Sequence, residues 1–196
     1  IIRINGDGSV RMIYSGTTAP TEAQATVMTG TGTQINATTY AFNSTYNDNM
    51  YVGYMYTSGS VHGYGTSSTI KTAIDTWYSS NLASYASKIA DSVYCNDRSN
   101  YTDSTGTTSG GGTGTTTTYY GAYIRLKTNK SPVLTCPNTT DAFTVSDITH
   151  GNAHLTYPIG LIMADEIAMA GGVYNTANSS YYLYTSQFYW AGSPNG

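Results

Sequence analysis

The chain has 196 residues, a net charge of −3, and charged side chains at only 10% of its positions. About a quarter of the residues are charged in ordinary soluble domains. Without a cluster of Lys and Arg, the chain lacks the positive charge on which non-specific nucleic-acid binding depends. No apolar run approaches the roughly 20 residues that a membrane-spanning helix needs.

Neutral polar residues and tyrosine replace the missing charges. The sequence contains 33 Thr, 21 Ser, 14 Asn and 20 Tyr. Thr and Tyr are typical of half-buried β-strands, whereas Tyr, Ser, Gly and Asn together are typical of antibody-like recognition loops. Two interpretations therefore stay open, a β-rich surface protein with few charges and a protein with a recognition surface. The length fits one domain, so we expect residues 1–196 to form a single extracellular domain.

The first residues carry the clearest local pattern. Apolar residues alternate with polar ones on both sides of Asn5-Gly6-Asp7-Gly8, which predicts a β-hairpin over residues 1–14. A calcium loop would need more oxygen ligands at regular spacing than this turn offers. Residues 15–45 read as a long surface loop, and residues 50–56 have the length of a strand.

Helical spacing begins after this strand. Ile70, Ile74, Trp77 and Tyr78 predict a helix over residues 68–78 with its apolar stripe in the core, and a second short helix is expected to continue to about Ala90. Residues 102–118 are low in complexity and rich in Gly and Thr, so we expect an exposed loop there. Residues 119–126 alternate as a strand does, and residues 142–145 predict a short strand.

The last third of the chain predicts a strand or extended segment over residues 157–162 and a helix over residues 164–170. Asp165 and Glu166 fall in the first turn of this helix, where negative charge favours the helix dipole. Gly171 and Gly172 are expected to end it. Residues 181–184 and 187–190 predict two short strands or a hairpin.

Cys95 and Cys136 are the only two cysteines. Paired cysteines persist outside the cytosol, and the composition favours that location, so we expect a disulfide between them. In the chain-entropy model this bridge stabilises the fold by about 4 kcal/mol. It brackets the low-complexity loop at 102–118.

The sequence contains none of the common catalytic fingerprints. His150 and His154 have the spacing of helical metal ligands, but Gly151 and Asn152 between them favour a loop. Adjacent helical residues point about 100° apart, so Asp165 and Glu166 cannot form an acid–base pair with each other. A triad of Cys95, His62 and an aspartate stays open, although Cys95 has a better use in the disulfide. We expect no enzyme activity, no metal and no cofactor.

Several motifs in a fixed order carry a resemblance. They are IIRINGDGSVRMIY, STIKTAIDTWY, YCNDRS, YPIGLIMADEIAMAGG and YYLYTSQFYW followed by Ser-Pro. Over most of its length the chain resembles a group of uncharacterised surface proteins of gut Firmicutes and related Bacilli, which often carry a prepilin-like or other membrane-anchored N-terminus. The resemblance implies a cell-surface location and does not imply a biochemical role.

A more distant resemblance is to the C-type-lectin-like fold of the formylglycine-generating-enzyme type, in which a helix start, a Gly-Gly end and a later Tyr-Trp strand recur. Met163 departs from that pattern, because relatives usually have a Thr there that makes a capping box with Glu166. Trp190-Ala191-Gly192 also departs from the Trp-Thr-Met of relatives, and their later Arg-Pro-Val-like strand has no counterpart. The copper-binding cysteines and the calcium motifs of those groups are absent as well.

We therefore expect an α+β fold, with a twisted antiparallel sheet, two main helices and long irregular loops, C-type-lectin-like in its topology. The expected function is that of a non-catalytic, adhesin-like binding domain on a bacterial surface, for a host or surface glycan or a protein. The alternative is a structural pilin-like subunit that contacts neighbouring copies of itself. The expected ligand-binding residues are Tyr174, Asn175, Asn178, Tyr181, Tyr182, Tyr184, Gln187 and Tyr189.

Overall fold

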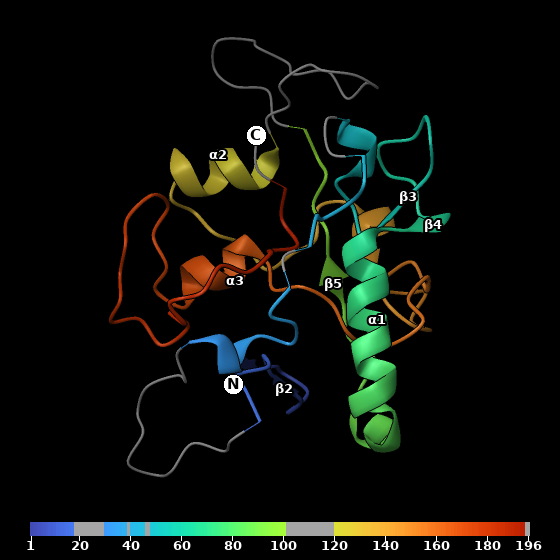
Figure 1. The fold of residues 1–196 in the computed structure, drawn as a ribbon. Coiled ribbons are helices and arrows are strands. Elements are labelled where there is room, and N and C mark those ends of the chain that lie inside the picture. Colours follow the sequence, from blue (N-terminus) through green and yellow to red (C-terminus); the bar gives the residue numbers. More distant parts are fainter. Residues whose placement is uncertain (18–29, 39, 46–47, 101–119, 195–196) are drawn as a thin grey trace.

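Short helices and short strands joined by long irregular segments make up this chain (Figure 1). The computed structural model describes residues 1–17, 30–38, 40–45, 48–100 and 120–194. Within these ranges the strands pair as three separate two-stranded antiparallel sheets. The mixed α+β class is thus confirmed, but the expectation of one twisted sheet is wrong, because no strand in the described part pairs with more than one neighbour.

The first sheet is the predicted N-terminal hairpin, β1 (Arg3–Ile4) against β2 (Val10–Arg11). Its turn is held by the Asp7 carboxylate, which accepts hydrogen bonds from the amide and the hydroxyl of Ser9 at 2.9 and 2.7 Å. Gly8 has φ +84°, a conformation that L side chains rarely adopt. The turn chemistry read from the sequence therefore forms as expected.

Two further sheets lie closer to the core. β3 (Met55–Tyr56) pairs with β4 (Thr66–Ser67), and β5 (Tyr94–Cys95) pairs with β6 (Ala142–Phe143). The strand predicted over residues 142–145 is thus present in its first half. Only the end of the segment 50–56 is a strand, because the 3-10 turn η2 (Asn49–Tyr51) precedes it.

The long helix α1 (Thr69–Asn81) begins where its cap residue predicts. The Ser68 hydroxyl accepts a hydrogen bond from the Lys71 amide at 3.2 Å, as N-cap side chains do. Ile70, Ile74 and Tyr78 form the buried stripe. The second expected helix is the 3-10 segment η3 (Ala83–Lys88), which exposes most of its side chains.

The strand predicted over residues 119–126 is wrong, because a helix forms in most of this segment. Residues 119–126 were expected to alternate as a strand, but Gly121–Lys127 forms the helix α2. Tertiary contacts decide this short segment, since Ala122 and Ile124 are buried in the helical conformation and Arg125 makes two ion pairs from it. Arg125 and Lys127 in the last turn also favour the helix dipole.

The core centres on Tyr54, Phe143 and Leu155. The rings of Tyr54 and Phe143 meet edge to face with their centroids 5.7 Å apart, a favoured arrangement of aromatic pairs. The buried Tyr54 hydroxyl donates to the Leu161 carbonyl at 3.0 Å. Residues 157–162 contain no paired strand and are partly buried, and Ile162 at the end of the segment is buried.

The helix α3 (Ala164–Met169) follows this segment, as expected, and Gly171 ends it with φ +107°. Residues 181–184 and 187–190 do not pair with each other, so the predicted strands or hairpin are wrong. Residues 173–190 instead form an irregular loop, which we call the aromatic belt. In Figure 1 it is the orange-to-red loop that leaves α3 and returns toward the C-terminus.

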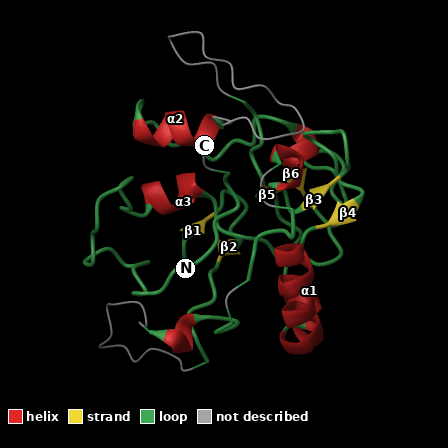
Figure 2. Ribbon diagram, turned by 45° about the horizontal axis from the view of Figure 1, so that its top comes forward, coloured by secondary structure: helices red, strands yellow, loops and turns green. Residues whose placement is uncertain are grey.

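Three elements lie one beneath another in this half of the molecule: α2, α3 and the N-terminal hairpin (Figure 2). The disulfide between Cys95 and Cys136 is present, with the two Cα atoms 5.5 Å apart. The low-complexity loop at 102–118 lies outside the described residues. No helix in the described ranges has the length and hydropathy of a membrane span.

Candidate functional site

Seven charged side chains of the described residues are buried, which are Arg11, Lys71, Asp97, Arg98, Asp141, Asp165 and Glu166. All four arginines of the chain form ion pairs with carboxylates. The most buried pair joins Arg98 to Asp141, and neither side chain has any solvent exposure. Both groups were absent from the expected site residues, and the only sequence signal was the Asn-Asp-Arg run beside Cys95.

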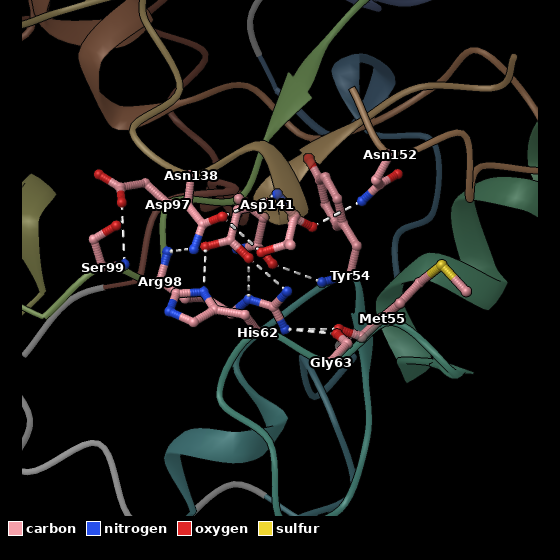
Figure 3. Close-up of polar contacts among 12 residues, drawn as sticks. Tyr54, Met55, His62, Gly63, Asp97, Arg98, Ser99, Asn138, Asp141 and Asn152 are labelled. Carbon is pink, nitrogen blue, oxygen red and sulfur yellow. Dashed lines mark hydrogen bonds and ion pairs between the residues drawn. The ribbon is translucent and has the colours of Figure 1, made fainter. Parts of the chain in front are cut away.

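The Arg98–Asp141 pair is satisfied on every side (Figure 3). The carboxylate accepts from Arg98 Nε at 2.9 Å, from Nη2 at 2.6 Å and from the Arg98 amide at 3.0 Å. The remaining guanidinium nitrogen donates to the carbonyls of Met55 and Gly63. A buried charge pair with its hydrogen bonds complete supports the structure and leaves little capacity for a ligand.

His62 adds a half-exposed imidazole to the same carboxylate, with its Nδ1 2.9 Å from Asp141 Oδ2 (Figure 3). A histidine oriented by an aspartate is one part of a hydrolytic triad. The Cys95 thiol that the sequence left open as the nucleophile is consumed by the disulfide. The arrangement therefore holds a His–Asp pair in place without a cysteine nucleophile beside it.

Helix α3 is the centre of the second group of ion pairs. Asp165 receives both Arg125 Nε and Nη2 at 2.7 Å, and Arg125 also reaches Asp97 at 3.1 Å. Glu166 pairs with Arg3 at 2.5 Å and with Arg11 at 3.4 Å. The two acidic residues do stand in the first turn, but they are buried and connect α3 to α2 and to the hairpin.

The amide groups at the start of α3 also find partners. Glu166 accepts a hydrogen bond from the Met163 amide at 3.0 Å, which is the glutamate half of a capping box. The Ser193 hydroxyl, far along the chain, accepts from the Ala164 amide at 3.0 Å. Ser193 thus caps the first amide of the helix, whereas an N-cap Thr at position 163 would accept from the second or third. Its hydrogen bond also fixes the chain that follows the aromatic belt to α3.

Both ends of the aromatic belt are held tightly. The Gly172 amide donates to the Ile167 carbonyl at 2.9 Å, and a Cβ at Gly172 would lie 2.7 Å from the Ile167 side chain. At the other end the Gly192 amide donates to the Ile162 carbonyl, and the Gly192 carbonyl accepts from Asn96 at 2.6 Å. The belt therefore leaves and rejoins the core at two close-packed glycines.

Four of the eight expected ligand residues mainly shape the belt itself. Asn178 accepts from the Ser180 amide at 3.1 Å, and Gln187 donates to the neighbouring Ser186 carbonyl. Tyr182 donates to the Ile2 carbonyl at 3.4 Å, and Tyr181 shares a hydrogen bond with Tyr189. These side chains are partly buried, so the structure does not bring all eight to one exposed surface.

The exposed members of the expected site are Tyr174, Asn175, Tyr184 and Tyr189. Phe188, which the prediction omitted, is fully exposed, and Trp190 is about half exposed at 48%. Composition alone missed these two residues because the prediction favoured Tyr and Asn, the residues of antibody-like loops. The sequence pattern instead predicts a strand over residues 187–190, which include Phe188 and Trp190.

A recess of about 320 Å³ opens beside the belt, near the small end of the range for ligand pockets. Its apolar lining comes from Ile2, Leu134 and Met169, and Tyr182 of the belt forms part of its wall. The ion pair between Arg3 and Glu166 supplies the charged groups. The recess is thus a mostly apolar hollow whose charges already face each other.

The two candidate metal histidines do not act together. His150 is exposed and pairs with Asp147, with its Nδ1 2.7 Å from the carboxylate. The His154 ring stacks on Tyr64, with their centroids 3.9 Å apart. Within the described residues, no group of three or more His, Cys, Asp or Glu side chains is placed to hold a metal ion.

Comparison with protein-family models, with curated proteins and with solved structures gives no match for this chain. The fold and the belt geometry are therefore the grounds on which a function is proposed.

Proposed function

We propose that this chain is a non-catalytic binding domain displayed on a bacterial cell surface, and that the aromatic belt is its recognition surface. One observation carries the proposal: large aromatic side chains gather on an irregular loop whose two ends are fixed to the core. Tyr174, Tyr184, Phe188, Tyr189 and Trp190 all expose a substantial part of their rings. A contiguous exposed apolar patch commonly marks an interaction site in soluble domains, and we propose that these rings form one.

The surrounding structure supports a recognition role. Binding loops placed on a rigid scaffold are a common arrangement in proteins. Here the scaffold is α3, which the partly buried pairs Asp165–Arg125 and Glu166–Arg3 connect to its neighbours. The Cys95–Cys136 disulfide fits an oxidising compartment outside the cytosol. Together these features support an adhesin-like domain.

The test is a glycan array and an array of extracellular proteins, each probed with the disulfide-intact chain. We expect signals that disappear in a variant with Tyr184, Phe188 and Tyr189 all changed to Ser. The matched control is Tyr85→Ser, a tyrosine on η3 that is more exposed than Tyr184 or Tyr189, and this variant should keep every signal. Signals that survive in the belt variant, or no signal from a chain whose folding has been verified, would overturn the proposal.

A pilin-like subunit is the second candidate, and the N-terminal hairpin favours it. Ile4, Val10 and Met12 are exposed large apolar residues on or beside a hairpin whose two strands pair only with each other in the described part of the chain. A second copy could cover this surface by adding a strand to the open edge. Electron microscopy and sedimentation at high concentration distinguish the two functions, because filaments support the subunit and a monomer at every concentration excludes it.

A further inference from the structure

We infer that the ligand of the aromatic belt is an uncharged carbohydrate, which rests on the proposed binding function and narrows it to one chemical class. The first support is the charge of the loop. No charged residue follows Glu166 in the chain, so residues 167–196 contain no Asp, Glu, Lys, Arg or His. An anionic polymer, such as nucleic acid or an acidic polysaccharide, would find no cation on this loop.

Tyr189 does not add charge at neutral pH. Burial, and then the hydrogen bond with Tyr181, raise the pKa of Tyr189 above its ordinary value of 10.0. The hydroxyl of Tyr189 therefore stays protonated and available as a donor or an acceptor. The belt presents neutral groups throughout the physiological range.

The second support is that some of the exposed rings are held in place. The Trp190 indole N–H donates to the Tyr40 carbonyl at 2.9 Å, and its ring meets Phe42 edge to face at 5.6 Å. The Tyr189 hydroxyl lies 3.1 Å from that of Tyr181. Rings that are already ordered lose little conformational entropy on binding, which favours recognition of a ligand with few strong contacts.

An exposed ring is also held in place by a neighbouring ring at the start of the belt. The Tyr174 ring meets Tyr123 of α2 edge to face at 5.7 Å, and Asn175 occupies the left-handed region with φ 55° in a turn closed between Val173 and Thr176. Both Tyr174 and Asn175 are exposed. An ordered ring therefore stands beside an exposed amide.

Ordered aromatic rings beside neutral polar groups match the chemistry of sugars. Aromatic faces carry partial negative charge and attract the weakly positive C–H bonds on the apolar face of a pyranose ring. Sugar hydroxyls need neutral donors and acceptors at the rim, which amides and hydroxyls provide. Asn175, Ser179 and Ser186 expose such groups along the belt. Protein-binding surfaces are instead enriched in Arg as well as aromatic residues, and the belt has no Arg.

The recess beside Tyr182 extends this surface. Its Arg3 guanidinium is already paired with Glu166, and the second arginine of that cluster, Arg11, is buried over the ring of Tyr94 with its guanidinium carbon 4.1 Å from the centroid. The recess thus offers hydrogen bonds and apolar contact more readily than a cation. An acidic sugar is the competing ligand, because Arg3 of the recess lining and the buried Arg11 share one carboxylate, that of Glu166.

The experiment is affinity electrophoresis and calorimetric titration of the disulfide-intact chain with neutral glucans, galactans and mannans, and with hyaluronate and polygalacturonate as acidic probes. We expect binding to at least one neutral polymer, with an affinity that is unchanged between about 0.05 and about 0.5 M salt, since screening acts only on charges. Tyr189→Ala should weaken it by about tenfold or more, equivalent to about 1.4 kcal/mol. Tyr189→Phe, which keeps the ring, should retain most of the affinity, and Tyr85→Ala should retain all of it.

The other outcomes show whether only the neutral-carbohydrate inference fails or the proposed binding function fails with it. Binding only to acidic probes, or an affinity that falls with salt, overturns the neutral-carbohydrate inference and keeps the belt as a binding surface if Tyr189→Ala still abolishes it. Belt-dependent binding to proteins in the array experiment, with none to polysaccharides, has the same meaning. Neutral-polymer binding that survives Tyr189→Ala and the triple belt variant overturns both.

Discussion

Removing the charge of Asp141 should be among the most damaging single substitutions in this protein. Asp141→Asn keeps the shape of the side chain but leaves the Arg98 guanidinium without its carboxylate at a site with no solvent exposure. Breaking a buried pair from one side costs about 3–5 kcal/mol, because the remaining charge stays buried without compensation. A domain of this kind has only about 5–15 kcal/mol of stability in total.

Urea unfolding followed by tyrosine and tryptophan fluorescence measures this loss. With a slope of about 2 kcal/mol per M, the midpoint should fall by about 2 M. Asp147→Asn is the matched control, because that carboxylate pairs with His150 at the exposed surface, so its loss should lower the midpoint much less. If the two variants lose the same stability, the argument that Arg98 needs Asp141 for its burial is refuted.

Three further changes test separate parts of the fold. Changing both Cys95 and Cys136 to Ser should lower the free energy of unfolding by about 4 kcal/mol, and adding reductant to the unaltered protein should have a similar effect. Gly63→Ala should destabilise by about 1–3 kcal/mol, because a Cβ there would lie 2.4 Å from the Thr57 backbone nitrogen. Asp91→Asn should flatten the acid limb of a stability–pH curve. Although burial opposes it, hydrogen bonds from three backbone amides lower the pKa of Asp91 below 3.8, so its contribution is present above that pH and is lost as the pH falls.

Each of these predictions has its own contrary result. Equal unfolding midpoints with and without the Cys95–Cys136 bridge would show that the bridge constrains the unfolded chain little. Wild-type stability of Gly63→Ala would show that the Thr57 segment relaxes at no cost. An acid limb unchanged by Asp91→Asn would assign that limb to other carboxylates with lowered pKa values, such as Asp7 and Asp147.

Local chemistry explains which elements could be predicted from the sequence. The Asn5–Gly8 turn, the Ser68 cap and the Gly171 stop each act within a few residues, and each forms as predicted. The disulfide followed from cysteine number and compartment, and it is present. In each case the determining interaction lies within the local segment or is a covalent bond.

Long-range polar contacts explain which elements could not be predicted. Helix α2 reads as a strand locally, and its helical form is favoured by contacts from Arg125 to Asp97 and Asp165, which are distant in sequence. The belt also reads as strands, but its backbone and side chains bond to Gly30, Tyr40 and other segments. Composition assigned the candidate surface to residues between Tyr174 and Tyr189, whereas the exposure of Phe188 and Trp190 required the structure.

The two glycines that close the aromatic belt affect which insertions and deletions this fold can tolerate. Gly172 and Gly192 fasten the two ends of the loop through backbone hydrogen bonds, which do not depend on the exposed side chains between them, such as Tyr184 and Phe188. Doubling the length of a flexible loop costs only about 0.6 kcal/mol of closure entropy. A chain built this way can therefore lengthen or shorten the exposed part of this loop at small entropic cost while the same framework continues to fold.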